Sequence, residues 1–324
     1  MTTEIKPSTL KPLKVSFVIS AYNEEGNVTE LFRCLRSHEK PDLEYEYIYV
    51  NDGSSDVTAL RIKELAVAYQ DVKLISFSRN FGHEVAMVAG LDFATGDAVI
   101  FMDADLQHPP EISAVFIDYW LSGKKLVLSR RANNPQRGVM YQWFSRFFYY
   151  ILGLLSECDL KANYPDFRLV DRKYADYLKK FREPAAMFRG FIGWIQNEEE
   201  LELVEFEVPP RLSGDSKYNF RRLFKLAIDA TFSFSLKPLR LAMMISASGL
   251  TVSVILGLYL LIPYLLYGKE VEGFLTIAFT VLFLGNIQLM VMSILGEYIG
   301  RIHMQVKNRP LYVIKEVIND LPQD

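Results

Sequence analysis

Two aspartates one residue apart follow an apolar run and could hold a divalent cation. Residues 101–111 read FMDADLQHPPE, in which Asp103 and Asp105 end the apolar run and Gln107 follows. Carboxylate and amide oxygens are hard ligands, and Mg²⁺ is usually held by one or two carboxylates together with substrate phosphates. A cation that bridges a diphosphate stabilises the negative charge of a leaving group. The alternative is a solvated turn whose acids cap a helix.

The segments around these acids predict an α/β fold with a mostly parallel sheet. Apolar, β-rich runs alternate with helical patterns, which is typical of βαβ units. The predicted strands are 14–20, 45–50, 72–77 and 97–103, and the predicted helices are roughly 26–38, 56–70 and 83–95. Ligands of such sheets bind beyond the carboxyl ends of the strands. Polar residues stand at those ends, namely Asn23, Glu24, Asp52, Arg79, Asp103 and Asp105.

Composition and missing motifs exclude several classes of protein. Lys and Arg total 36 against 39 Asp and Glu, so the chain lacks the basicity of a nucleic-acid-binding domain. No GxGxxG or GxxxxGK[ST] follows a predicted strand, which disfavours a dinucleotide-binding fold and a P-loop NTPase. The two cysteines, Cys34 and Cys158, form no CxxC pattern, so a disulfide scaffold and a Cys-based zinc site are not expected.

An ordered series of motifs resembles glycosyltransferase family 2, whose catalytic domain has the GT-A fold (Rossmann-like). The motifs that carry this resemblance are VISAYNE (18–24), VNDGSSD (50–56), SRNFGHE (78–84) and MDADLQHPPE (102–111). Later segments are similar to polyprenyl-phosphate glycosyltransferases, especially the bactoprenol glucosyltransferase branch, which is related to dolichol-phosphate mannose synthase. These segments are DFRLVDRK (166–173), GDSKYNF (214–220), FSFSLKPLR (232–240) and LGEYIGRIHMQVKNRPLYVI (295–314).

The resemblance implies a site for a UDP-sugar donor. Asp52 would read the uracil beside Tyr22 and Glu24, and Asp103 would lie near the ribose or the metal. Arg130 would meet phosphate charge. The ligands implied for Mg²⁺ or Mn²⁺ are Asp103, Asp105 and Gln107.

On the acceptor side, the resemblance implies that Asp166 is the catalytic base. Arg211, Ser216 and Lys217 would bind the donor and acceptor phosphates. The acceptor would be a lipid monophosphate, whose second pKa is about 6 by analogy with phosphorylated side chains. It is therefore mostly dianionic at neutral pH, and a strong base is less necessary than for a sugar hydroxyl. We expect Asp166 to orient the acceptor or to take its last proton, while cationic groups gather the two anionic reactants.

Two long uncharged stretches predict a pair of transmembrane helices. Residues 241–268 and 274–296 contain no charged side chain, and each exceeds the roughly 20 residues that span a bilayer core. Lys and Arg flank the outer ends, so the positive-inside rule places both termini in the cytoplasm. Residues 217–236 read as a basic amphipathic helix at the membrane surface, and residues 139–155 as a second interfacial helix. The alternative is a pair of buried core helices.

The sequence thus predicts a metal-dependent, inverting glycosyltransferase of the plasma membrane. The expected parts are a cytoplasmic GT-A domain (1–216), a juxtamembrane helix (217–238), two transmembrane helices (239–298) and a cytoplasmic tail (299–324). Glucose would pass from a UDP-sugar to polyprenyl (undecaprenyl) phosphate at a lipid surface, and the resemblance suggests a homotetramer. The alternatives are another sugar (aminoarabinose-type, mannose or N-acetylhexosamine), a processive polysaccharide synthase, whose QxxRW motif is missing, or a non-catalytic scaffold.

Overall fold

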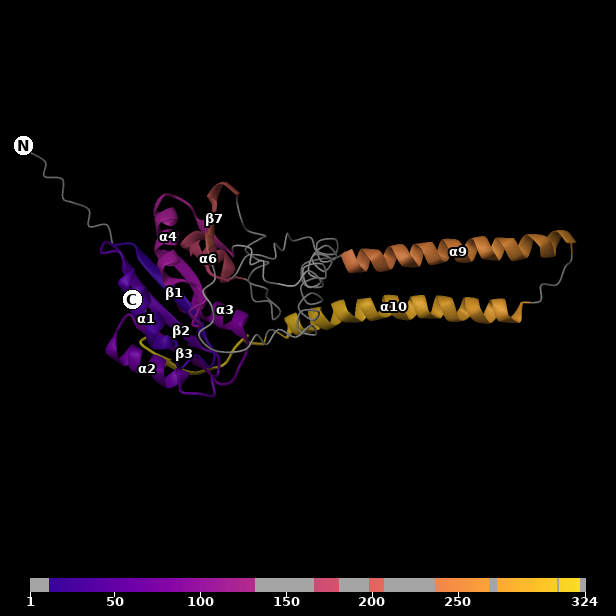
Figure 1. Cartoon of the computed structure of the whole chain (residues 1–324). Helices are drawn as coiled ribbons and strands as arrows, with labels where there is room; N and C mark the ends of the chain where they lie inside the picture. Colours follow the sequence, from indigo (N-terminus) through magenta and orange to yellow (C-terminus); the bar gives the residue numbers. More distant parts are fainter. Residues whose placement is uncertain are drawn as a thin grey trace, which may run out of the picture. The chain divides into compact units, whose positions relative to one another are not determined.

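The computed structural model describes residues 12–131, 166–180, 198–206, 237–267, 273–307 and 309–320. The chain divides into two compact units. The first consists of Met1–Phe144, Leu160–Lys217 and Pro310–Asp324, and the second of Ser145–Asp159 and Tyr218–Arg309. Figure 1 shows the sheet and helices of the first unit and the two long helices of the second.

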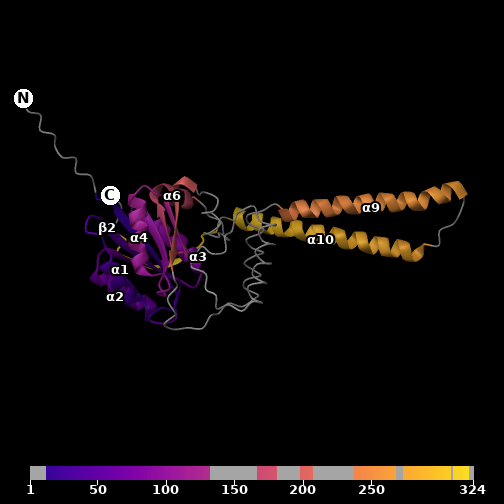
Figure 2. The same ribbon diagram turned by 45° about the horizontal axis from the view of Figure 1, so that its top comes forward.

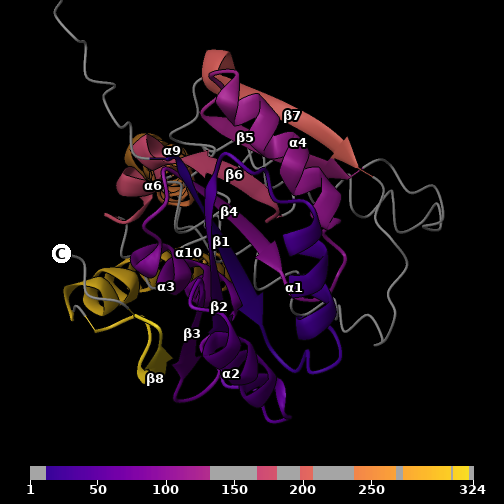
Figure 3. The ribbon, with the colours of Figure 1, turned by 90° about the vertical axis from the view of Figure 1, so that its left-hand side faces the viewer.

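The first unit is built on a sheet in the strand order β7-β5-β6-β4-β1-β2-β3-β8 (Figure 3). Its strands are β1 (Lys14–Ala21), β2 (Glu44–Asn51), β3 (Val72–Phe77), β4 (Ala98–Asp103), β5 (Leu126–Arg131), β6 (Arg168–Asp171), β7 (Leu201–Phe206) and β8 (Ile314–Ile318). The central strands β4, β1, β2 and β3 are parallel to their neighbours in that group, whereas β6 and β8 join it antiparallel. The predicted α/β class with a mostly parallel sheet is confirmed.

Helices cover both faces of this sheet. They are α1 (Val28–Ser37), α2 (Thr58–Ala68), α3 (His83–Phe93), α4 (Pro110–Leu121) and α6 (Arg172–Leu178), with a short 3-10 turn at Glu198–Glu200. Each strand and helix expected before residue 104 exists, with ends within two residues of the predicted ones. Figure 3 shows α1, α2 and α4 on one side of the sheet and α3 and α6 on the other. The strand–helix alternation in the sequence therefore predicts the layers correctly.

The main core lies between the sheet and α1, α2 and α4. Alternate residues of β1 (Val15, Phe17 and Ile19) pack there with Leu31 of α1 and Phe116 of α4, all buried. This alternation follows from the two-residue period of a strand. On the opposite face, α3 lies so close to the sheet that a Cβ on Gly90 would be 2.2 Å from the Val18 side chain. Glycine at this position therefore allows the close packing that fixes α3.

The second unit contains two long helices, α9 (Lys237–Tyr267) and α10 (Phe274–Val306). They contact each other and run antiparallel (Figure 2). Many of their large apolar side chains are exposed, including Leu250 and Ile255 of α9 and Leu289 and Ile299 of α10. By length and composition alone, one stretch among the described residues could cross a membrane, Phe283–Met304 in α10. Two long helices lie where the pair of transmembrane helices is predicted, but one described stretch meets this test, so the membrane-spanning pair stays a prediction.

The C-terminal segment extends the sheet, although the sequence predicts a tail from residue 299. Helix α10 continues to Val306, and β8 then pairs antiparallel with β3. The Tyr312 ring stacks on Phe77 with centroids 5.1 Å apart, and its hydroxyl donates to Asp92 at 2.7 Å. Most of β8 is exposed and held by backbone pairing. An exposed edge strand leaves little hydrophobic periodicity, which is why the sequence does not reveal it.

One buried carboxylate ties the amino ends of the central strands together. Glu46 of β2 is 2% exposed and accepts from Ser16 Oγ (2.5 Å) and Thr95 N (2.6 Å). The Nζ atoms of Lys14 and Lys73 lie 3.0 and 3.4 Å from its carboxylate. Burial alone would raise the pKa of Glu46, but these hydrogen bonds and positive charges outweigh burial and lower the pKa to about 2.

We predict that Glu46→Gln destabilises the protein in a pH-dependent way. A folded-state pKa of about 2, against an ordinary value near 4.5, corresponds to about 3 kcal/mol. Because the pKa is depressed on folding, this stability is fully present above pH 4.5 and is lost as the pH falls toward 2. Thermal unfolding of the detergent-solubilised chain should show a lower Tm for Glu46→Gln at pH 7 and a smaller difference near pH 3. Glu44→Gln, at an exposed position of the same strand, is the control. An equal Tm for wild type and Glu46→Gln at pH 7 would contradict this prediction.

Candidate active site

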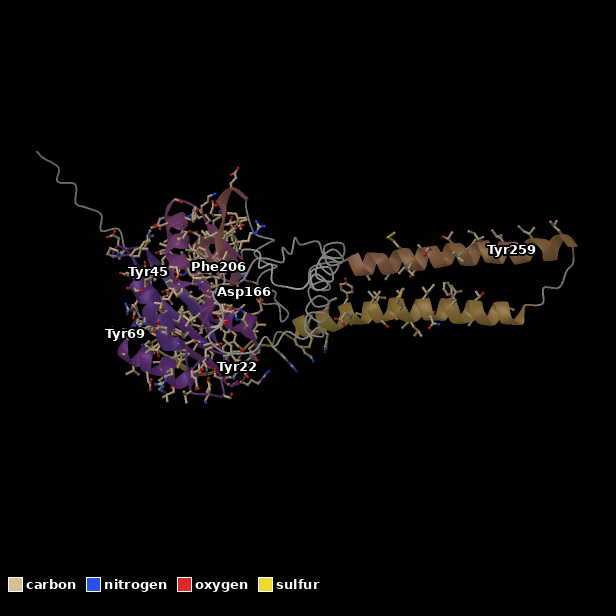
Figure 4. All side chains as sticks on the ribbon, in the orientation of Figure 1. Tyr22, Tyr45, Tyr69, Asp166, Phe206 and Tyr259 are labelled. Carbon is tan, nitrogen blue, oxygen red and sulfur yellow. The ribbon has the colours of Figure 1, made fainter. Side chains whose placement is uncertain are left out.

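The carboxyl ends of the central parallel strands meet at one edge of the sheet. Ser20 of β1 stands beside Asp103 of β4, and Ala21 beside Asn51 of β2. From β1 the sheet continues through β2 on one side and β4 on the other, which makes this edge a topological switch point, where ligands of open α/β sheets bind. Antiparallel β6 begins here, because Arg168 pairs with Phe101 of β4. Figure 4 shows Asp166 and Tyr22 on the side away from Tyr45 and Tyr69, as this strand order requires.

His83, the first residue of α3, joins two of the predicted site carboxylates. Its Nδ1 is 3.2 Å from Asp103 Oδ1 and 2.7 Å from Ser20 Oγ, and its Nε2 is 3.2 Å from Asp166 Oδ2. Burial disfavours the charged imidazolium, but Asp103 and Asp166 more than compensate, raising the pKa of His83 to about 10. The sequence predicted the two carboxylates but assigned no role to His83.

Asp166 is 5% exposed and has cationic partners on both carboxylate oxygens. Oδ2 faces His83, and Oδ1 accepts from Arg168 Nη2 at 2.8 Å. Arg168 Nε also donates to the Asp166 backbone oxygen at 3.1 Å. Arg168 is buried, and the sequence did not single it out, although residues two apart on a strand share a face. Both carboxylate oxygens of Asp166 are held by protein side chains, which suits an orienting group better than a strong base.

The DADLQ segment forms a tight turn after β4. Leu106 has φ 59°, an uncommon conformation for a residue with a side chain, and Gln107 N donates to Asp105 Oδ1 at 3.0 Å. The Asp103 backbone N–H donates to Nδ1 of His108 at 3.0 Å. The His108 ring is buried and stacks on Phe167 with centroids 5.0 Å apart. His108 therefore supports the turn that carries Asp103 and Asp105.

The donor set of this turn fits a hard divalent cation that also binds phosphate. Asp103 and Asp105 supply carboxylates on one turn, and Gln107 supplies an amide oxygen. Among the described residues, no group of three or more His, Cys, Asp or Glu side chains could hold a metal by itself. Mg²⁺ is commonly bound by one or two carboxylates with substrate phosphates and water completing the shell. The residues present match that kind of site, not an all-protein metal cage.

Asp52 ties the turn after β2 to the start of α3. Its Oδ1 accepts from Phe81 N at 2.7 Å and its Oδ2 from Gly82 N at 3.0 Å, and the residue is 3% exposed. Burial raises the pKa of Asp52, and the two backbone N–H groups partly oppose that rise. Gly53, with φ 67°, lies so close to the next loop that a Cβ would be 2.4 Å from the Arg79 backbone carbon. Asp52 thus positions the loop that presents His83.

The turn after β1 is fastened to the turn after β2. Asn23, with φ 57°, donates its backbone N–H to Ser54 Oγ at 3.0 Å and accepts from Ser55 N at 2.8 Å. Glu24 N donates to Thr58 Oγ1 at 2.8 Å. The Tyr22 side chain is half-exposed beside this turn. Tyr22 and Glu24 therefore lie on a turn that hydrogen bonds hold to the turn carrying Asp52.

Arg130 lies on β5, near the start of β6. Leu128 pairs with Arg168 in the antiparallel β5–β6 ladder, so Arg130 is on the Asp166 side of that pair. Its Nη1 is 3.6 Å from Glu205 on β7, and the side chain is exposed. The predicted phosphate-binding residues Arg211, Ser216 and Lys217 lie outside the described residues, as do the expected interfacial helices at 139–155 and 217–236.

Acidic strand ends at the switch point of a mostly parallel sheet define an α/β protein with a site of the kind that binds nucleotides. The family model for glycosyl transferase family 2 matches residues 16–178. The SfII prophage-derived bactoprenol glucosyl transferase of Shigella flexneri is 36% identical, covering 94% of this chain and 98% of the relative. A prophage bactoprenol glucosyl transferase homolog of Escherichia coli is 35% identical over 94% of this chain and 99% of that protein. The chain belongs to glycosyltransferase family 2, as its motifs predict.

The chain also resembles a solved structure of low sequence identity. Glucosyl-3-phosphoglycerate synthase from Mycobacterium tuberculosis, solved with Mn²⁺, uridine-diphosphate and phosphoglyceric acid, is 17% identical with a TM-score of 0.48. The alignment covers 68% of this chain and 76% of that one.

We predict that Gly53→Ala weakens both stability and glycosyl transfer. An added Cβ would meet the Arg79 backbone, and alanine at positive φ costs a further ~1 kcal/mol or more. Transfer should fall at least tenfold, because the loop that carries His83 must move. Gly26→Ala is the matched control, since nothing lies within 4 Å of a Cβ there. Equal unfolding free energies and rates for the two variants would contradict the prediction.

Proposed function

We propose that the protein transfers glucose from UDP-glucose to a polyprenyl phosphate, with inversion at the anomeric carbon. The observation that carries this proposal is that Asp103 and Asp166 meet through His83 at the switch point of the sheet, with Asp105 on the turn that follows Asp103. Relatives of nearly the same length are named bactoprenol glucosyl transferases, which supports both the sugar and the lipid carrier. The product would be a polyprenyl-monophosphate sugar.

On the donor side, Asp52 with Tyr22 and Glu24 would form the surface for the uracil. The hydrogen bonds between the turns after β1 and β2 support this assignment, because they hold the turn that carries Tyr22 and Glu24 against the turn that carries Asp52. Asp103, Asp105 and Gln107 would hold Mg²⁺ or Mn²⁺, which would neutralise the diphosphate when bound. Asp103 would also reach the ribose.

On the acceptor side, Asp166 would orient the lipid phosphate or take its last proton. Its contacts with His83 and Arg168 support orientation over strong base catalysis. Arg130, at the same edge, would meet phosphate charge together with Arg211, Ser216 and Lys217. The phosphate needs little activation because it is mostly dianionic at neutral pH. The task of the site is then to bring two anions together.

The helices α9 and α10 would form a membrane hairpin that holds the site near its lipid acceptor. The exposed apolar side chains of both helices and the Phe283–Met304 stretch support this arrangement. By the positive-inside rule, the basic flanks of this hairpin would put both termini in the cytoplasm. The basic residues 217–238 would lie at the membrane surface, and the chain would assemble as a homo-oligomer, a tetramer by its family resemblance.

The proposal is tested with the full chain purified in detergent, polyprenyl phosphate, Mg²⁺ or Mn²⁺ and a panel of nucleotide sugars. Labelled lipid product should appear with UDP-glucose, and it should disappear when the metal is chelated. If lipid product forms only with a different UDP-sugar, the proposed reaction stands and that sugar is the donor. Absence of lipid product with every donor would overturn the proposal.

We predict that Asp105→Ala reduces transfer at least 100-fold, because the cation loses a carboxylate ligand while the fold keeps its core. The measurement is the rate of lipid-product formation, with Tm confirming that the variant is folded. Asp118→Ala, an exposed carboxylate on α4, is the control and should keep the wild-type rate. Transfer by Asp105→Ala within a few-fold of wild type would count against the metal assignment.

A further inference from the structure

We propose that His83 is a positioning residue that holds the donor-side carboxylate of Asp103 and the acceptor-side carboxylate of Asp166 in one hydrogen-bonded row. The inference rests on the proposed function, since it assumes that Asp103 faces the nucleotide sugar and Asp166 the lipid phosphate. It adds a residue that neither the motifs nor the composition assigned to the reaction.

Each ring nitrogen of His83 has its own partners. An ionised carboxylate can only accept, so Nε2 donates to Asp166 Oδ2 across 3.2 Å. The Ser20 hydroxyl donates to Asp103 Oδ1 at 3.2 Å, and its oxygen lies 2.7 Å from Nδ1 of His83. Nδ1 is also 3.2 Å from Asp103 Oδ1. The ring therefore bridges Ser20 and Asp103 on one side and Asp166 on the other.

The surroundings of the ring hold it in place. His83 follows Gly82, whose backbone N–H donates to the buried Asp52 at 3.0 Å. Helix α3 is fixed on the sheet at Gly90, against Val18 and Val50. Arg168 holds the second oxygen of Asp166 at 2.8 Å. The ring position is thus set by the sheet, by the loop after β3 and by the start of β6.

A side chain that bridges two carboxylates has a definite task in a reaction between anions. Asp103 and Asp166 would otherwise repel each other and the incoming phosphate groups, since like charges a few ångströms apart interact strongly where water is partly excluded. His83 is 35% exposed at its side chain, so a reactant can approach the ring. It would keep the two carboxylates at a constant separation while donor and acceptor bind. The expected effect of its loss is on the rate of transfer, not on nucleotide binding.

The test uses the full chain in detergent and three substitutions of His83. His83→Ala should lower kcat about 100-fold, as expected for a misplaced reactive geometry, with the Kd of UDP in Mn²⁺ changed less than threefold by calorimetry. His83→Lys and His83→Gln each keep a hydrogen-bond donor and should retain at least tenfold more kcat than His83→Ala. His38→Ala, at the end of α1, is the control and should match wild type.

A double-mutant cycle tests the link to Asp166. If His83 acts through Asp166, the kcat loss of His83→Ala with Asp166→Asn should be clearly smaller than the product of the two single losses. Fully multiplicative losses, a kcat within threefold of wild type for His83→Ala, or a kcat of the Lys and Gln variants no higher than that of His83→Ala would each overturn the inference. A parallel loss of UDP binding and Tm would also overturn it, because it would show a purely structural role. Failure of the wild type to form lipid product would instead refute the proposed function.

Discussion

Like charges gathered at one edge of a sheet must be held by opposite charges, and this constraint shapes the whole described site. Strand β4 of the parallel group and antiparallel β6 bring Asp103 and Asp166 together at the switch point. His83 faces both, and Arg168 holds the far oxygen of Asp166. The two partners come from different elements, His83 from α3 and Arg168 from β6, so the acidic edge is complete only when α3 is packed on the assembled sheet. Ion pairs with such limited exposure are costly to break, because a lone carboxylate there would stay charged and unpaired.

The loops around this edge form one connected structure. Asn23 fastens the turn after β1 to the turn after β2, and Asp52 fastens that turn to the start of α3. Gly53 permits the contact with the Arg79 backbone that closes the connection. Side chains expected to face a nucleotide therefore rest on the same backbone hydrogen bonds as His83. This kind of support keeps a site preorganised before substrate binds.

The sequence predicts the central sheet well because strand–helix alternation and apolar strands are local signals. It also predicts that Asp52 and Asp103 belong to one edge, because both follow predicted parallel strands, whereas Asp166 is assigned to the site only by the family resemblance. Contacts between distant segments have no such local signal and could not be predicted. His83 lies in the SRNFGHE motif, but nothing local says that its ring lies between Asp103 and Asp166. Arg168 reads as an ordinary strand residue, and β8 is too exposed to leave a periodic pattern. Roles for Arg211, Ser216 and Lys217, and the interfacial helices, stay predictions.

The most direct measurement is an experimental structure of the full chain with UDP-glucose and Mn²⁺. The account predicts a cation shared by Asp105 and the diphosphate oxygens, the uracil against the turn that carries Asp52, and the anomeric carbon open toward Asp166. A nucleotide bound away from the carboxyl ends of β1, β2 and β4, or a metal that touches neither Asp103 nor Asp105, would contradict it.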